Sequence, residues 1–174
     1  MACTITKNRP LPCRDSVGGV KNIYFGDFTD LGTLTFVEGI VTAWTGTDPT
    51  WTKWEVKSTS SLEQAINASR ENGTRFYEQT ITAVFPKLDV DSQDELDNIV
   101  KAKPLVAIED NNGNFLLCGF KFGCDVNGGS ISTGTALGDL SGFNLTLVGQ
   151  EPLPAYFITS TLITGNLSGT DIDA

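Results

Sequence analysis

Residues 61–85 read SLEQAINASRENGTRFYEQTITAVF, and this stretch decides how the rest of the chain is organised. Two runs of strand-forming residues flank Asn72 and Gly73, a dipeptide that strongly favours a tight β-hairpin turn because both residues tolerate a positive φ. A two-residue turn at this point predicts the register of the hairpin. The predicted pairs are Arg70 with Arg75, Ala68 with Tyr77, Ile66 with Gln79, Gln64 with Ile81, and Leu62 with Ala83.

Because side chains alternate along a strand, this hairpin has two distinct faces. One face is predicted to reach the core and is interrupted by two glutamines; its members are Leu62, Gln64, Ile66, Ala68, Tyr77, Gln79, Ile81, Ala83 and Phe85. The other face is polar, with Ala65 and Phe76 as exceptions, and carries Glu63, Asn67, Ser69, Glu78, Thr80 and Thr82. A one-residue slip would mix the two sets, so we expect one core face and one polar face.

The arms of this hairpin, about ten residues each, are longer than the usual strand of about five or six. Long arms leave edges whose backbone groups need partners, and Arg70 facing Arg75 would place like charges side by side near the tip. Both features favour completion of the hairpin by other strands, from this chain or from other copies. The alternative is a long surface hairpin with a solvated tip.

The charge and composition of the chain exclude several classes of function. The net charge is −9 and no Lys or Arg follows Lys121, so tight binding of a phosphate backbone is disfavoured. The chain has no histidine, which removes Ser–His and Cys–His catalytic pairs and zinc sites with His ligands. The N-terminus lacks an apolar signal-peptide core and no apolar run is long enough to span a membrane. We therefore expect a cytoplasmic, non-enzymatic protein.

No metal site or cofactor is expected. The four cysteines, Cys3, Cys13, Cys118 and Cys124, lack the spacing of a four-thiolate zinc site. Cys118 and Cys124 are predicted on one face of a continuous strand, about 20 Å apart and beyond disulfide reach unless that strand breaks between them. The acidic residues around Asp94 are predicted to be partners of a helix dipole rather than calcium ligands.

The remaining elements predict a mainly β domain. Residues 1–19 are expected to form an N-terminal arm, residues 20–162 an antiparallel β-sandwich or barrel of about seven to nine strands, and residues 163–174 a flexible acidic tail. One helix is predicted between the two hairpins, with Ser92 as N-cap, Glu95 completing a capping box, and Pro104 ending it. Further strands are expected at 20–28, 32–36, 38–44, 51–57, 105–109, 115–122, 143–148 and 155–162, with a loop at 127–136.

Three segments resemble small virion structural proteins of tailed bacteriophages: MACTITKNRPLPCRDSVGGVKNIYF, VAIEDNNGNFLLCG and ALGDLSGFNLTLVGQEP. The order of long hairpin, capped helix and second hairpin is similar to that of the tail tube (major tail) protein family. The resemblance covers residues 1–154 and includes no catalytic motif.

The resemblance implies a structural subunit that forms stacked hexameric rings, whose lumen conducts DNA without binding it specifically. The lumen would be lined by Glu63, Asn67, Ser69, Glu78, Thr80 and Thr82. The hairpin tip, with Arg70, Glu71 and Arg75, would contact other subunits. The partners would be other copies of the chain, other tail proteins and the passing DNA, with no membrane and no cofactor. The protein would reside in the virion tail, and in the host cytoplasm during assembly.

Two other classes of function stay open. A neck ring, a tail-terminator ring or a capsid decoration protein would share the composition of this chain. A carbohydrate-binding β-sandwich would use Trp44, Trp51 and Trp54 as an aromatic platform.

Overall fold

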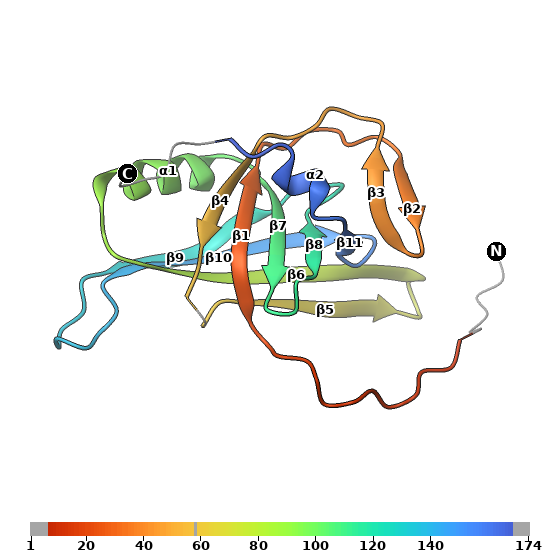
Figure 1. The fold of residues 1–174 in the computed structure, drawn as a ribbon, viewed down its shortest axis with the longest axis horizontal. Coiled ribbons are helices and arrows are strands. Elements are labelled where there is room, and N and C mark those ends of the chain that lie inside the picture. The colour runs from red at the N-terminus through yellow and green to blue at the C-terminus, as the bar shows by residue number, and fades with distance from the viewer. Residues whose placement is uncertain (1–6, 58, 169–174) are drawn as a thin grey trace.

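Two sheets make up most of the structure, a computed structural model that describes residues 7–57 and 59–168 (Figure 1). The larger sheet has seven strands, in the spatial order β2 (Leu34–Val37), β3 (Ile40–Trp44), β11 (Tyr156–Ile158), β8 (Phe115–Cys118), β7 (Leu105–Asp110), β1 (Val20–Gly26) and β4 (Trp51–Glu55). The smaller sheet has four, in the order β5 (Ser61–Ser69), β6 (Thr74–Pro86), β10 (Gly142–Glu151) and β9 (Asp125–Ser132). The helices are α1 (Val90–Lys101) and α2 (Thr161–Thr164).

The predicted mainly β fold is confirmed, with three corrections. The described residues contain two helices where one was predicted, because α2 follows the short strand β11. The sheets are not purely antiparallel, because β11 runs parallel to β3 and makes the larger sheet mixed. The described strands also form no closed barrel, because the smaller sheet ends in two edge strands, β5 and β9.

Strands β1 and β7 are buried on both faces and separate two hydrophobic cores. In β1, Ile23 and Phe25 point into the core between the sheets, whereas Tyr24 points into the second core. In β7, Val106 and Ile108 lie in the first core, whereas Leu105 and Ala107 lie in the second. A strand covered on both faces is apolar along its length rather than alternating, as the run LVAI in β7 shows.

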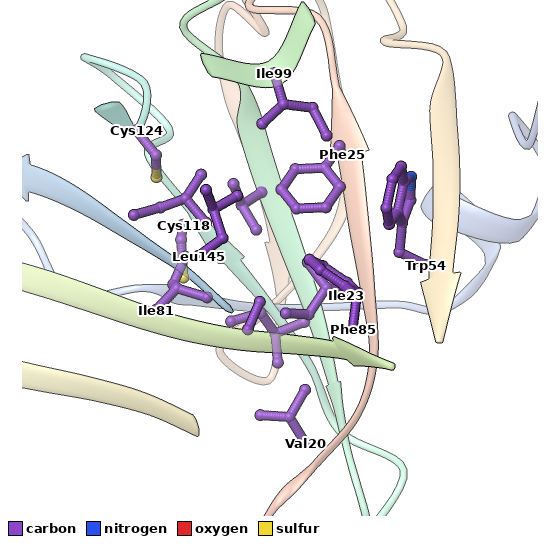
Figure 2. Packing of buried hydrophobic residues seen from close by; sticks show 14 of the residues in the cluster. Val20, Ile23, Phe25, Trp54, Ile81, Phe85, Ile99, Cys118, Cys124 and Leu145 are labelled. Atoms are coloured by element: carbon purple, nitrogen blue, oxygen red, sulfur yellow. The ribbon is translucent and has the colours of Figure 1, made fainter. Parts of the chain in front are cut away.

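The first core joins the two sheets and is closed at one end by α1 (Figure 2). Trp54 packs edge-on against Phe25 and Phe85, with ring centroids 6.0 and 4.9 Å apart. Leu96 and Ile99 are the buried side chains of α1. The second core lies on the other face of the larger sheet, where the fully buried Trp51, Val41 and Leu117 pack with Ile163 of α2; its members are Tyr24, Leu31, Val41, Trp51, Leu105, Ala107, Leu117, Ile158 and Ile163.

A buried carboxylate also holds β1 to β7. Glu109 accepts hydrogen bonds from Lys21 Nζ (2.7 Å), Asn22 Nδ2 (2.6 Å) and Tyr24 Oη (2.9 Å). Burial opposes ionisation of Glu109, but these three donors outweigh it and leave its pKa below the ordinary value. Burial raises the pKa of Tyr24, and the Glu109 carboxylate raises it further.

The hairpin register differs from the prediction by two residues. Leu62 pairs with Ile81, Gln64 with Gln79, and Ala68 with Arg75. Of the two turn residues only Gly73 has a positive φ, +62°, so the connection is a four-residue loop rather than a two-residue turn. Ser69 Oγ accepts the Asn72 N–H (3.3 Å) and supports the longer loop. A shift of two residues keeps every side chain on its predicted face.

Helix α1 begins one turn earlier than predicted. Asp89 is the N-cap, with extended backbone and a side chain that accepts the Ser92 N–H at 3.0 Å. The predicted capping box of Ser92 and Glu95 is therefore wrong, because another good cap residue stands three positions upstream. The helix ends at Lys101, before Pro104 as predicted.

The second arm of the second hairpin and the segment that follows it also differ from the prediction. The strand predicted over 115–122 ends at Cys118, since Gly119 and Gly123, both with positive φ, reverse the chain. Cys118 and Cys124 are buried free thiols with raised pKa values, that of Cys124 reaching about 12. The predicted loop at 127–136 instead contributes most of strand β9, where Gly129 lets the strand approach Asn144 closely.

The first residues of the expected flexible C-terminal tail, 163–168, pack against the rest of the fold. Ile163 is fully buried, and Leu167 forms an isolated bridge with Trp51. Trp51 also donates its N–H to Asn166 O (2.9 Å) and accepts from Ser168 N–H (2.9 Å). Residues 169–174 of that tail and residues 1–6 of the arm lie outside the described residues.

Ile81→Asp and Thr80→Asp test the two faces of β6. Ile81 is fully buried between the sheets, so an unpaired carboxylate there should cost on the order of several kcal/mol and abolish folding. Thr80 is half-buried on the other face, and its substitution should leave the thermal midpoint within a few degrees. Circular dichroism during heating measures both; equal effects of the two changes would contradict the face assignment.

Candidate functional site

The outward face of the smaller sheet gathers the polar residues singled out in the hairpin sequence. Cross-strand pairs join Glu63 to Thr80, Ala65 to Glu78, and Ser61 to Thr82. Side chains of directly paired residues lie on the same face of a sheet. All six residues that the sequence places on the polar face therefore share it, namely Glu63, Asn67, Ser69, Glu78, Thr80 and Thr82.

Strands β10 and β9 extend this face beyond the hairpin. Thr146 pairs with Thr82, Val148 with Thr80, and Gln150 with Glu78. On the far side of β10, Asp125 and Ser130 of β9 continue the same face. The alternation in FNLTLVGQ could have revealed the β10 residues from sequence, whereas the glycines of β9 hid that strand.

We define the polar face as the outward positions of these four strands. Its charged members are Glu63, Glu78 and Asp125, and no Lys or Arg occupies an outward position of β5, β6, β9 or β10. Glu78 accepts a hydrogen bond from Gln150 Nε2 (3.3 Å). The face is therefore acidic and lined mainly by hydroxyl and amide side chains, with Phe76, Val84 and Val148 as apolar exceptions.

The three residues predicted at the hairpin tip are separated by the longer loop. Arg70 and Glu71 lie in the four-residue loop and are exposed. Arg75 lies on the inner face opposite Ala68, with its guanidinium 5.8 Å from the Tyr77 ring centroid. The predicted contact of Arg70 with Arg75 is therefore absent.

Within the described chain, both outer strands of the smaller sheet are paired with another strand on one side only. Strand β10 covers β6 over ten residue pairs, so one arm of the hairpin is completed by a strand of this chain. Strand β5 pairs only with β6, and β9 only with β10. Each edge also exposes large apolar side chains on the inner face: Ile66 of β5 is 69% exposed, Ile131 of β9 is 65% exposed, and Val100 of the adjacent α1 is 52% exposed.

The two glutamines that interrupt the core face bind backbone groups of the loops beneath it. Gln79 Oε1 accepts from Gly119 N–H (3.0 Å), and Gln64 Oε1 accepts from Ala155 N–H (2.9 Å). Beside them the buried Glu151 accepts the N–H groups of Lys121 (2.9 Å) and Phe122 (2.7 Å). Burial nevertheless raises the pKa of Glu151 above its ordinary value, because it outweighs these two hydrogen bonds.

The tryptophans do not form a shared platform for a sugar ring. Trp51 and Trp54 lie on opposite faces of β4, in the second and first cores. Trp44 packs beside the second core and donates its indole N–H to Asp48.

The described residues contain no cluster of three or more side chains able to hold a metal ion. None of the helices in the described part of the chain is long and apolar enough to cross a membrane.

Comparison with known proteins adds no assignment: no family model, curated protein or solved structure matches this chain.

Glu151→Gln tests the buried carboxylate. A carboxyl group whose pKa is raised by folding lowers stability as pH rises from its unfolded pKa through its folded pKa. The glutamine keeps an oxygen that can accept both backbone N–H groups but carries no charge. We expect the variant to be more stable than the parent protein at pH 7, with the difference vanishing below about pH 4. Urea unfolding at several pH values measures this; a variant less stable at pH 7 would contradict the stated cause.

Proposed function

We propose that this protein is a tail tube subunit of a tailed bacteriophage, forming rings that stack into a tube through which DNA passes. The observation that carries the proposal is the smaller sheet, which combines an acidic polar face with two unpaired edges. The resemblance of the sequence to virion proteins supports the same assignment.

The two edges of the smaller sheet are suited to pair with each other in neighbouring copies. The strands alternate in direction from β5 through β6 and β10 to β9, so β9 of one copy and β5 of the next would pair as an antiparallel ladder. Their lengths also match, at eight and nine residues. Because the two edges differ, the contact is head-to-tail and closes into a ring when the rotation fits. Such a ring would pair backbone groups at both edges of the smaller sheet.

The same pairing would bury apolar side chains that one copy leaves exposed. Joining β5 to β9 places Ile66 of one copy on the same inner face as Ile131 of the neighbouring copy. Burial of a large aliphatic side chain contributes roughly 1.5–3 kcal/mol. Backbone pairing and apolar burial therefore favour the same contact.

A ring built this way would turn the polar face toward its lumen. Glu63, Glu78 and Asp125 would then repeat around the channel without a compensating Lys or Arg on the face. Like charges repel a passing polyanion and prevent it from adhering.

Stacking of rings into a tube, rather than formation of a single ring, is favoured by the ends of the smaller sheet. The β5–β6 tip and the β9–β10 loop extend from opposite ends (Figure 1). The tip exposes Arg70 and Arg75 against one acid, Glu71. The opposite loop carries Asp139, whose pKa is lowered by hydrogen bonds from the backbone and side chain of residues 135–136. Stacking would bring these opposite charges together, which gives a neck ring, tail-terminator ring or decoration protein less support.

The double variant Glu63→Lys with Glu78→Lys tests this function. Electron microscopy should show rings and tubes for both the parent protein and the variant, because neither residue lies on the inner face. Particles with the variant should eject DNA more slowly, since lumen ammonium groups bind phosphates by counterion release, and added salt should reduce the defect.

The matched control is Glu38→Lys with Glu95→Lys, which makes the same charge change at exposed positions outside the polar face. It should eject DNA at the normal rate. A parent protein that stays monomeric at every concentration would contradict the proposed assembly. Normal ejection by the Glu63/Glu78 variant would contradict the lumen assignment alone.

A further inference from the structure

A groove of about 540 Å³ opens where the β1–β2 connection, the β8–β9 turn and the β10–β11 connection meet. Its apolar lining includes Phe28, Phe120, Leu153 and Tyr156, and its charged lining consists of Asp30, the buried Glu151 and Lys121. Phe28 and Leu153 are each 44% exposed, and Phe120 packs edge-on against Tyr156 with centroids 5.6 Å apart. The groove is therefore aromatic and partly open, and its two carboxyl groups outnumber its one lysine.

The N-terminal arm has the complementary chemistry. Its segment Arg9-Pro10-Leu11-Pro12 carries an aliphatic side chain between two prolines, and Leu11 is 97% exposed. Prolines favour the extended polyproline II conformation, which loses little entropy on binding. Lys7, Arg9 and Arg14 outnumber Asp15 in the arm, whereas the whole chain carries a charge of −9.

The arm is fixed at its base and projects from it. Asn112 accepts the Val17 N–H (2.8 Å) and donates to Val17 O (2.7 Å), and Asn111 donates to Gly18 O (2.8 Å). Beyond this anchor the arm runs along the outside of the molecule (Figure 1). These contacts fix where the arm leaves and leave its proline segment exposed.

We propose that the arm of one copy docks in the groove of a neighbouring copy. Leu11 and its flanking prolines pack against Phe28, Phe120 and Tyr156, in the way that aromatic grooves bind proline-rich segments. Arg9 or Arg14 pairs with Asp30 at the rim. This inference rests on the proposed assembly and names a second contact between copies, separate from the edges of the smaller sheet.

The position of the groove favours a neighbouring copy over the same chain. The arm enters β1 at Val20, whereas Phe28 and Asp30 follow the opposite end of that strand. In Figure 1 the arm leaves the lower end of β1 and runs out to the right, clear of both sheets in this view, before it turns upward. An arm that reaches outward meets the groove of another copy without turning back along its own strand.

Disulfide capture between two full-length chains tests the proposal, because Cys13 stands directly after the proline segment and is exposed. One chain keeps Cys13. The other carries Cys13→Ser and Leu153→Cys and bears a size tag. Both carry Cys3→Ser, and the buried thiols of Cys118 and Cys124 are protected by their raised pKa values. With oxidised glutathione present, the mixed disulfide dimer should form at least about tenfold faster than with Leu137→Cys in place of Leu153→Cys, since docking raises the effective concentration.

The control position Leu137 is fully exposed in the β9–β10 loop, outside the groove. Leu11→Asp in the arm-bearing chain should remove the rate advantage without affecting the fold, because Leu11 touches no core residue. Rings or tubes with equal rates for Leu153→Cys and Leu137→Cys would overturn the arm contact and leave the assembly standing. A single chain with both Cys13 and Leu153→Cys that closes only on itself would overturn the neighbouring copy as the partner. Absence of rings, tubes and mixed dimers together would overturn both proposals.

Discussion

Both hydrophobic cores depend on one pair of strands, β1 and β7, which is covered on both faces. A strand pair buried on both faces needs a layer of other elements packed on each face. The smaller sheet and α1 supply the first layer, while β2, β3 and α2 contribute to the second. Glu109 ties the pair together and receives bonds from Lys21, Asn22 and Tyr24, so that the buried carboxylate is compensated. The smaller sheet therefore packs against the rest of the domain through its inner face only.

That one-sided attachment gives the smaller sheet its functional character. Its inner face is committed to the core through Ile81, Leu145 and Leu147, so the outward face is free to carry polar and acidic groups. Gln64, Gln79 and Glu151 bind the adjoining loops and hold the far end of the sheet in place. A sheet supported in this way keeps two edges of unpaired backbone groups, and a natural protein must cover or pair such edges. The proposed pairing between copies would meet this requirement and would create a continuous acidic surface, so the edges and the polar face support the same proposal.

The sequence predicts the faces of the hairpin better than its register. Alternation alone assigns Glu63, Thr80 and Ile81 to their faces, and the two-residue register error left these assignments unchanged. The register itself depends on the Ser69 side chain and on Gly73 within a longer loop, which competed with the Asn-Gly turn signal. Strand β9 was missed because its glycines are typical of a loop, although Gly129 permits close approach to β10. The groove joins loops distant in sequence, so no local pattern could predict it. The burial of Ile163 likewise depends on tertiary packing rather than on local composition.

Amide hydrogen exchange, compared between the monomeric and assembled protein, tests the pairing of the two edges most directly. Amides of β5 and β9 that point away from β6 and β10 lack a strand partner in one copy, so they should exchange rapidly in the monomer. Assembly should slow these alternate amides by at least about tenfold on both strands, while the amides of β1 and β7, already paired on both sides, keep their rates. Tubes whose β5 and β9 amides exchange as fast as in the monomer would contradict the central claim that copies join through these edges.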